Sequence, residues 1–557
     1  MVHRLKKTYM LKTRKFLIAP LLTGALFFNL NTYAQAPAEA PAPELPKNWH
    51  LLDLKTDGYF GISLTPAYQL VKGKKSKTVV VATIDSGIDT AQKDLRPILW
   101  TNRKEKPGNG KDDDKNGYVD DVHGWNFLGG PGGNCNYTET TEEVREYNRL
   151  KGKYATITEA SATDKKEYAY WLKVKAVHDT TVTHSKTEFE QLSPVLNVLM
   201  ATSGYVKRDL KLTSDATFKT ADLSKINTTN DTVMQSKQIW ESIFQQQGGD
   251  KDNAEIIKDL SEYLTKLNND INPDLTSRQR IVGDNPDIWE TKPYGSNLLK
   301  FPDASHGTGV AGLIAAVRDN QYGINGVADN VRIMGIKAVP NGDEYDKDVA
   351  KAIRYAVDNG AQIINMSFGK KLSPHKKWVD DAYKYAASKD VLLVQAAGNE
   401  SEDGDVKPHY PNDNFEDGSS SDAANVIVVG ASGAKNDSTL AGSFSNYGKK
   451  NVDVFAPGVS VTSVDKDAEF NTADGTSFAS PITAGVAALV LEYYPKLSAK
   501  QIKQVILQSA APLNGTMVIK PGSKDEKVDF ATLSKTGGIV NAYKALQIAA
   551  TLKGERK

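Results

Sequence analysis

The sequence predicts an α/β fold in which a parallel sheet lies between helices and a large helical segment interrupts the sheet-forming part. Continuous β-branched runs such as 79–84 are typical of strands that are buried on both faces. Segments of helical periodicity separate these runs, and an alternation of strand and helix builds a parallel sheet. Residues 137–300 break the alternation, because they are more polar and mostly helical by period. We therefore expect a three-layer core that carries an α-helical insertion.

Each element is predicted from its own pattern. After the run at 79–84, four further apolar runs are expected to be strands, namely 331–336, 363–367, 391–396 and 426–430. Residues 348–359 and 378–389 have the helical period, and Gly360 follows the first of them as a stop signal. Within the insertion, helical faces are expected around 189–199, 239–244 and 256–267, although Pro194 argues against the first.

The N-terminal residues have the pattern of an export signal. Residues 1–36 combine a basic start, an apolar stretch at 16–28 and the small-residue sequence Ala34-Gln35-Ala36, which suits cleavage. An uncleaved N-terminal anchor is the alternative. The mature protein is expected in the periplasm or outside the cell, without a membrane span. The predicted organisation is a signal peptide at 1–36, a linker at 37–57, the core at 58–136 and 301–545, the insertion at 137–300, and a tail at 546–557.

Composition restricts the classes of function. A net charge of +1 gives no sign of a nucleic-acid partner, and 39% hydrophobic with 25% charged residues is ordinary for a soluble globular protein. Cys135 is the single cysteine, so no internal disulfide can form. It lies in a Gly/Asn-rich loop without an adjacent base, and we interpret it as an incidental thiol. Specificity must therefore come from a localised site.

Three segments rich in small residues have the composition of such a site. Ser477 precedes the apolar run 484–491 and is expected at the start of a buried helix, where free backbone N–H groups favour negative charge. An ordinary helix cap is the alternative interpretation. His306 begins a second small-residue helix, for which a core or capping histidine is the alternative. Asn399 follows a predicted strand, where its amide could donate to an oxyanion or simply form a turn.

The groups that activate a serine are also present. A serine hydroxyl needs a base within hydrogen-bond reach, and the base needs a carboxylate that fixes its tautomer and stabilises its cation. Asp85 ends the first predicted strand, and parallel sheets gather their sites at the carboxyl ends of strands. The chain therefore offers Asp85, His306 and Ser477, in that order, as parts of a nucleophilic site.

Five motifs resemble those of the subtilisin-like serine proteases, the subtilases. The resemblance covers roughly residues 50–133 and 301–545 and leaves the insertion outside it, and the Asp, His and Ser motifs follow the order found in subtilisin. One departure is Gly309, where the family often has a second histidine. The matching segments are Ile84-Asp85-Ser86-Gly87-Ile88-Asp89, Ser305-His306-Gly307-Thr308-Gly309-Val310-Ala311-Gly312, Asn365-Met366-Ser367-Phe368-Gly369, Ala397-Gly398-Asn399 and Gly475-Thr476-Ser477-Phe478-Ala479-Ser480-Pro481.

The resemblance implies a role for each matched residue. Ser477 would be the nucleophile, His306 the general base and then acid, and Asp85 the carboxylate that orients His306. Asn399 and the backbone N–H of Ser477 would form the oxyanion hole. The implied function is that of an exported serine endopeptidase, which hydrolyses protein or peptide substrates through an acyl-enzyme. The strand that pairs with the substrate and borders the pocket for the side chain before the scissile bond would be Ser367, Phe368 and Gly369.

A metal loop is predicted at 112–121. Its oxygen-bearing side chains alternate and Gly117 stands sixth, which resembles an EF-hand calcium loop. His123 replaces the usual glutamate at the twelfth position and no helix pair is predicted on either side, so a solvated acidic turn is the alternative. Asp94 matches a family position that often binds calcium. A structural Ca²⁺ ion is thus suggested, although the chemistry requires none. The predicted ligands are Asp94, Asp112, Asp114, Asn116 and Asp120.

Two other interpretations concern the insertion. In the first, the protein is a catalytically silent subtilase-like scaffold that binds a partner through its helices. The presence of Asp85, His306, Ser477 and Asn399 together argues against this, because a silent protein has no need of all four. In the second, the protein is an enzyme whose insertion acts as a gate or internal inhibitor. A helical decoration remote from the cleft is the alternative to that role.

Overall fold

The computed structural model describes residues 45–247, 251–290 and 292–556, so the predicted signal peptide lies outside the described residues. By their internal contacts these residues form two compact units. The first comprises 45–138 and 275–556, and the second comprises 139–274. Residues 275–300, which were included in the predicted insertion, therefore belong by their contacts to the first unit. No helix among the described residues is both long and apolar enough to cross a bilayer.

The first unit is built on a seven-stranded parallel sheet, which confirms the predicted fold class. The strand order is β2-β3-β1-β4-β5-β6-β7. All five predicted strands are present, and the short strands β2 and β7 were not predicted. The strands are β1 (Val79–Asp85), β2 (Gly124–Asn126), β3 (Val331–Lys337), β4 (Ile363–Met366), β5 (Leu392–Ala396), β6 (Val426–Ser432) and β7 (Val454–Pro457).

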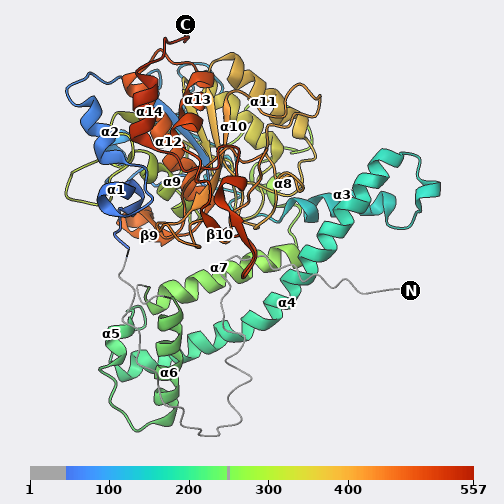
Figure 1. Cartoon of the computed structure of the whole chain (residues 1–557). Helices are drawn as coiled ribbons and strands as arrows, with labels where there is room; N and C mark the ends of the chain where they lie inside the picture. Colours follow the sequence, from blue (N-terminus) through green and yellow to red (C-terminus); the bar gives the residue numbers. More distant parts are fainter. Residues whose placement is uncertain (1–44, 248–250, 291, 557) are drawn as a thin grey trace. The chain divides into compact units, whose positions relative to one another are not determined.

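Both faces of the sheet are covered, because side chains along each strand point alternately to two apolar cores. In β1, Val79 and Val81 belong to one core, whereas Ala82 and Ile84 belong to the other. Helices α2 (Leu64–Val71), α9 (Ser305–Ala315), α12 (Thr476–Tyr493), α13 (Ala499–Ser509) and α14 (Ala542–Ala549) contribute to the first core. Helices α10 (Asp346–Asp358) and α11 (Lys376–Ser388) contribute to the second (Figure 1).

Shorter elements complete the first unit. Trp49, within the predicted linker, is fully buried and its indole N–H donates to the carbonyl oxygen of Ser460. Helix α14 runs across the predicted start of the tail at residue 546. Two antiparallel hairpins pair β8 (Val461–Val464) with β9 (Phe470–Ala473) and β10 (Met517–Ile519) with β11 (Lys527–Asp529). The remaining helical segments are α1 (Leu54–Asp57), α8 (Ser277–Ile281) and the 3₁₀ turns Trp49–Leu51, Arg96–Ile98, Lys466–Ala468 and Phe530–Thr532.

The second unit is helical and has its own apolar core. Leu199, Trp240, Phe244 and Leu260 are almost completely buried in it. Pro194 lies inside α4 and does not end it, because the apolar face on either side is packed while a proline removes only one helical hydrogen bond. The helices are α3 (Glu142–Tyr154), α4 (Lys165–Asp209), α5 (Thr220–Leu223), α6 (Asp231–Gln247) and α7 (Asn253–Ile271), with a 3₁₀ turn at Glu159–Ser161.

Candidate active site

Asp85 and His306 meet at the carboxyl edge of the sheet. Asp85 is the last residue of β1 and is 2% exposed, and His306 is the second residue of α9. The Nδ1 atom of His306 lies 2.7 Å from Oδ1 of Asp85, which also accepts the backbone N–H of Ser86. Burial lowers the pKa of His306, but the charge and hydrogen bond of Asp85, together with the charge of Asp465, raise it by more. The net pKa of His306 therefore lies above its ordinary value of 6.5.

Gly307 permits this contact between distant segments. A Cβ atom at Gly307 would lie 2.1 Å from the carbonyl oxygen of Gly87 and 3.1 Å from Oδ1 of Asp85. The turn after β1 and the start of α9 thus touch backbone to backbone, which only glycine allows. Gly309 also faces a close neighbour, since a Cβ there would be 3.3 Å from the carbonyl oxygen of Val464.

Ser477 lies in the first turn of α12 and is 8% exposed. Gly475 occupies the N-cap position and Ser477 is the second helical residue, which argues against the interpretation of Ser477 as an ordinary cap. A Cβ at Gly475 would lie 2.7 Å from Oγ of Ser477, so glycine keeps the space around the hydroxyl open. The ring of Phe478, the next residue, is 6.3 Å from the His306 ring. The first turn of α12 therefore lies close to His306.

The backbone of Ser477 is held by a side chain because α12 contains a proline. Pro481 has no N–H to donate to the carbonyl oxygen of Ser477 four residues earlier. The hydroxyl of Ser367 donates to that oxygen instead, at 2.9 Å. Asn365 in turn donates to Oγ of Ser367 and accepts the hydroxyl of Ser480, and all of these groups are buried. Ser367, predicted to bind substrate, thus also fixes the serine helix.

Asn399 is oriented with its amide N–H₂ free. Its Oδ1 accepts both the backbone N–H and the hydroxyl of Thr476, each at 2.9 Å. Neither Nδ2 of Asn399 nor the backbone N–H of Ser477 has a hydrogen-bond partner within the described part of the chain. Two donors beside Ser477 are therefore available to an oxygen that develops negative charge.

Asn446 supports the Asn399 turn and was not predicted. Its Nδ2 donates to the carbonyl oxygen of Ala397 at 2.9 Å and to Oε2 of Glu400 at 2.7 Å. Its Oδ1 accepts the backbone N–H groups of Glu400 and Glu402. No local pattern marks Asn446 in the sequence, because its partners lie more than 40 residues away.

Comparison with known proteins identifies the family. The family model described as "Subtilase family" matches residues 76–537. The chain belongs to the subtilase family. It is 39% identical to a thermophilic serine proteinase of Bacillus sp. strain AK1, 36% to subtilisin DY of Bacillus licheniformis and 35% to thermitase of Thermoactinomyces vulgaris. These alignments cover 38%, 39% and 43% of this chain and 48%, 74% and 75% of the relatives, so about half of the first relative's length is spanned.

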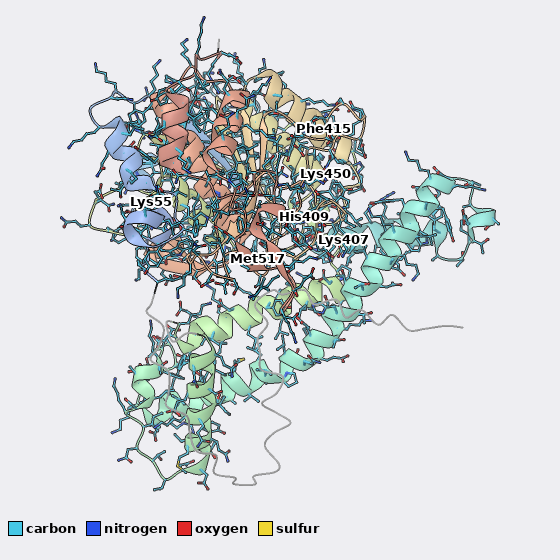
Figure 2. The ribbon with its side chains drawn as sticks, viewed as in Figure 1. Lys55, Lys407, His409, Phe415, Lys450 and Met517 are labelled. Carbon is cyan, nitrogen blue, oxygen red and sulfur yellow. The ribbon has the colours of Figure 1, made fainter. Side chains whose placement is uncertain are left out.

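In this subtilase, the strand that is expected to border the substrate pocket lies against the side chain of His409. Phe368 and Gly369 are half-buried. A Cβ at Gly369 would lie 2.1 Å from Nε2 of His409, and one at Gly398 would lie 3.1 Å from Cε1 of the same ring. The imidazole of His409 (labelled in Figure 2) therefore fills the space beside two bare backbone segments. Glu400 lies next to it, with Oε2 3.7 Å from Nδ1 of His409.

The predicted metal residues fall into separate groups. Carboxylate oxygens of Asp112, Asp114 and the unpredicted Glu105 lie within 4.8 Å of one another. Asp120 lies outside this group of carboxylates, and its oxygens accept the N–H groups of residues 109 and 110. Oδ1 of Asn116 accepts the backbone N–H of Tyr118. Glu105 precedes the loop, and so the spacing within the loop gives no sign of it.

Asp94 lies elsewhere and is completely buried. Its Oδ1 accepts the side-chain amide of Asn320 at 2.7 Å, and burial raises its pKa. Its Oδ2 faces Gly323 and is without a hydrogen-bond partner in the part of the chain that the structure describes. An uncompensated buried carboxylate oxygen is costly unless a cation neutralises it.

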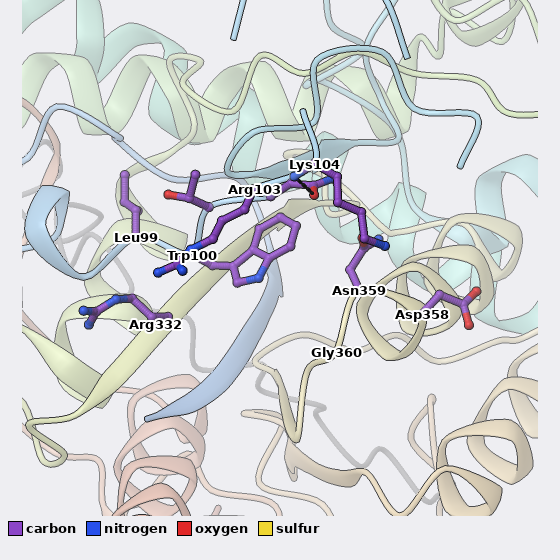
Figure 3. A pocket seen from close by; sticks show the side chains of 10 residues that line it. Leu99, Trp100, Arg103, Lys104, Arg332, Asp358, Asn359 and Gly360 are labelled. Atoms are coloured by element: carbon purple, nitrogen blue, oxygen red, sulfur yellow. Dashed lines mark hydrogen bonds between the residues drawn. The ribbon is translucent and has the colours of Figure 1, made fainter. Parts of the chain in front are cut away.

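Two further features lie away from the site. Burial raises the pKa of the Cys135 thiol to about 11, which agrees with an incidental thiol. A surface cavity of about 730 Å³ is lined by Trp100, Arg103, Lys104 and Arg332, among others (Figure 3). Arg332 is the second residue of β3, at the amino end of the strand. This cavity therefore opens at the edge of the sheet opposite to Asp85, and we assign it no part in catalysis.

The raised pKa of His306 gives a first prediction. In a ¹⁵N NMR titration of the intact protein, His306 is expected to titrate above pH ~6.5, because the Asp85 carboxylate favours the protonated ring. Asp85→Asn should lower this pKa, since burial then acts without the opposing charge. Asp465→Asn is the matched control and should lower it by less. A larger effect of Asp465→Asn would contradict the assigned geometry.

Proposed function

We propose that this subtilase is a serine endopeptidase in which Asp85, His306 and Ser477 act as the catalytic triad. The observation that carries the proposal is the 2.7 Å contact between Asp85 and His306, beside the first turn of the helix that bears Ser477. Its family is one of serine-type endopeptidases, which supports the same activity. The substrates would be proteins or peptides, paired along Ser367, Phe368 and Gly369.

The acylation step would follow from the positions of these groups. His306 takes the proton of the Ser477 hydroxyl while Oγ forms a bond to the carbonyl carbon of the scissile peptide. Asp85 stabilises the imidazolium that results. The carbonyl oxygen becomes an oxyanion, which accepts hydrogen bonds from Nδ2 of Asn399 and the backbone N–H of Ser477. When the C–N bond breaks, His306 returns the proton to the leaving amine, and an ester of Ser477 remains.

Deacylation would use the same groups with water as the nucleophile. His306 accepts a proton from a water molecule while the water oxygen forms a bond to the ester carbon. A second oxyanion then forms beside the same donors, Nδ2 of Asn399 and the N–H of Ser477. Collapse of this intermediate breaks the bond between the carbonyl carbon and Oγ of Ser477, and His306 gives its proton to Oγ, which becomes a hydroxyl again. The acid product leaves and the enzyme is restored. The rate depends on neutral His306, so activity is lost as the pH falls through its raised pKa.

Replacement of the nucleophile tests the proposed function. Ser477→Ala should lower kcat on a chromogenic peptide by several orders of magnitude and abolish labelling by a fluorophosphonate, while the melting temperature changes little. Ser498→Ala is a matched control, because Ser498 does cap a helix by accepting the N–H of Gln501. It should cost about 1 kcal/mol of stability and leave labelling intact. Full labelling of Ser477→Ala would refute Ser477 as the nucleophile, and wild-type protein that is neither labelled nor active would favour the silent binding protein.

The His409 ring suggests how the enzyme selects its cleavage site. The pocket for the side chain before the scissile bond is expected between the Gly369 and Gly398 backbones. His409 occupies the space against both of them, and Glu400 lies beside it. A large aromatic side chain would have to displace the imidazole. We therefore propose a shallow pocket that prefers small residues, despite the apolar Phe368 at its border.

Opening the pocket gives a gain-of-function test. His409→Gly should raise kcat/KM for peptides with Phe before the scissile bond, relative to peptides with Ala there, by about 10-fold or more, because differences of a few methylenes already change specificity by this amount. A gain of this kind cannot come from a damaged fold. His375→Gly, at the start of α11, is the control and should leave the ratio unchanged. An unchanged Phe/Ala ratio in His409→Gly would place the pocket elsewhere.

Calcium would have a structural role, since two groups of residues fit a hard cation. Glu105, Asp112 and Asp114 offer carboxylate oxygens within 4.8 Å, and Asp94 offers a buried oxygen without a partner. Ca²⁺ prefers such oxygen donors. Bound at either place, it would supply positive charge that stabilises the loops, and the reaction steps above proceed without it. The pattern at residues 1–36 supports export of the protein to the periplasm or the outside of the cell. Calcium is abundant there.

Metal removal tests this role. Millimolar Ca²⁺ should raise the melting temperature of chelator-treated protein by a few degrees, because a ligand present at about 100 times its Kd stabilises by ~2.7 kcal/mol. Glu105→Gln and Asp94→Asn should each reduce the rise, while Glu469→Gln, an exposed control, should not. Identical melting curves with Ca²⁺ and with chelator would exclude a structural calcium ion.

A further inference from the structure

A buried lysine connects the two halves of the candidate triad. Lys337 is the last residue of β3 and stands opposite Asp85 in the parallel register of β1 and β3. Its side chain is completely buried. Nζ donates to the carbonyl oxygen of Ser86 at 2.7 Å and to Oδ2 of Asp303 at 2.5 Å, and a longer contact of 3.5 Å reaches the carbonyl oxygen of Val339. All three protons of the ammonium group therefore have an acceptor.

The two strong contacts belong to different parts of the site. Ser86 follows Asp85 directly and forms the turn at the end of β1. Asp303 lies three residues before His306, in the segment that leads into α9, and its carboxylate is 12% exposed. The same segment is tied to the turn by the backbone N–H of Ile88, which donates to the carbonyl oxygen of Leu299 at 3.0 Å. One charged group thus bridges the turn that carries Asp85 and the segment that positions His306.

This bridge adds a charged contact to the neutral hydrogen bonds that link the turn after β1 to α9, among them the N–H of Asp89, which donates to Oγ1 of Thr308 at 2.9 Å. Asp85 and His306 are 221 residues apart in sequence. The N–H of Gly307 donates to Oγ of Ser86 over a longer distance, 3.2 Å. A charge-assisted hydrogen bond is stronger than a neutral one, and burial excludes the water that would weaken it.

We propose that the Lys337–Asp303 ion pair is a positioning pair for the triad, which sets the Asp85 turn against the start of α9 and so fixes the hydrogen bond between Asp85 and His306. The proposal rests on the proposed function of this site. Neither residue touches the reacting atoms. Their effect would pass through the orientation of the imidazole, on which proton transfer from Ser477 depends.

Lys337→Met tests the proposal, because it keeps the volume of the stem and removes the charge. At equal folded fraction, kcat on a peptide substrate should fall roughly 10- to 100-fold, with KM nearly unchanged, since a displacement of about 1 Å costs this much in a reacting geometry. The acid limb of the pH–rate profile should move to lower pH. The charged groups that face His306 are Asp85 and Asp465, and a loosened Asp85 contact leaves the imidazolium less stabilised.

Two further variants separate positioning from the cost of a buried charge. Lys337→Met with Asp303→Asn removes both charges and should recover stability while kcat stays low. Lys376→Met breaks another buried lysine–aspartate pair, the 2.5 Å contact with Asp380 on α11, and should change neither kcat nor the pH profile at equal folded fraction. Recovery of kcat in the double variant, or an equal loss in Lys376→Met, would overturn the proposal.

An NMR measurement that does not depend on catalytic activity distinguishes this proposal from the proposed function. The Nδ1 proton of His306, bonded to Asp85, should give a protected downfield resonance in the ¹H NMR spectrum of wild-type protein and exchange faster with water in Lys337→Met. If wild-type protein fails to hydrolyse peptides, the proposed function is refuted while this comparison still tests the ion pair. Equal exchange in the two proteins would reject it.

Discussion

The carboxylate of Asp85 and the imidazole of His306 lie 2.7 Å apart although 221 residues separate them in the chain. The rest of the site is arranged around this contact. It requires bare backbone at Gly87 and Gly307, because a single methyl group at either would collide with a carbonyl oxygen. The contact with Asp85 also raises the pKa of His306, so that its ring is a stronger base than a free imidazole. The end of β1 and the first turn of α9 hold the two side chains at this distance.

The position of Ser477 depends on a different set of hydrogen bonds. Pro481 leaves the carbonyl oxygen of Ser477 without its helical donor, and Ser367 supplies one from the neighbouring strand end. The backbone of Ser477, the proposed nucleophile, is therefore held by Ser367 and not only by its own helix. Thr476 binds Oδ1 of Asn399 and turns the amide donors outward. Hydrogen bonds thus tie the first turn of α12 both to the end of β4 and to the Asn399 turn.

The long insertion is compatible with this precision for two physical reasons. Residues 139–274 pack around their own core, so the catalytic sheet does not need them to bury its apolar surface. The entropy cost of closing a loop rises only slowly with its length, and a folded insertion reduces it further. Residues 299–303, which follow the insertion and lead into α9, then bind the turn after β1 through a backbone hydrogen bond and through the Lys337–Asp303 ion pair. These contacts bring together the two segments that the insertion separates in sequence.

The sequence by itself determined the elements whose signal is local. β-branched runs marked five of the seven strands, and glycine-flanked motifs marked Asp85, His306, Asn399 and Ser477. β2 and β7 were missed because three or four residues carry too little periodicity. Only the tertiary structure decided the roles of the groups that act on distant segments. They are Glu105 beside the acidic loop, Asn446 under the Asn399 turn, His409 between two glycine backbones, and Lys337 between the triad motifs. Each makes contacts across 7 to 251 residues of sequence, and a pattern along the chain records spacing but not which segments meet.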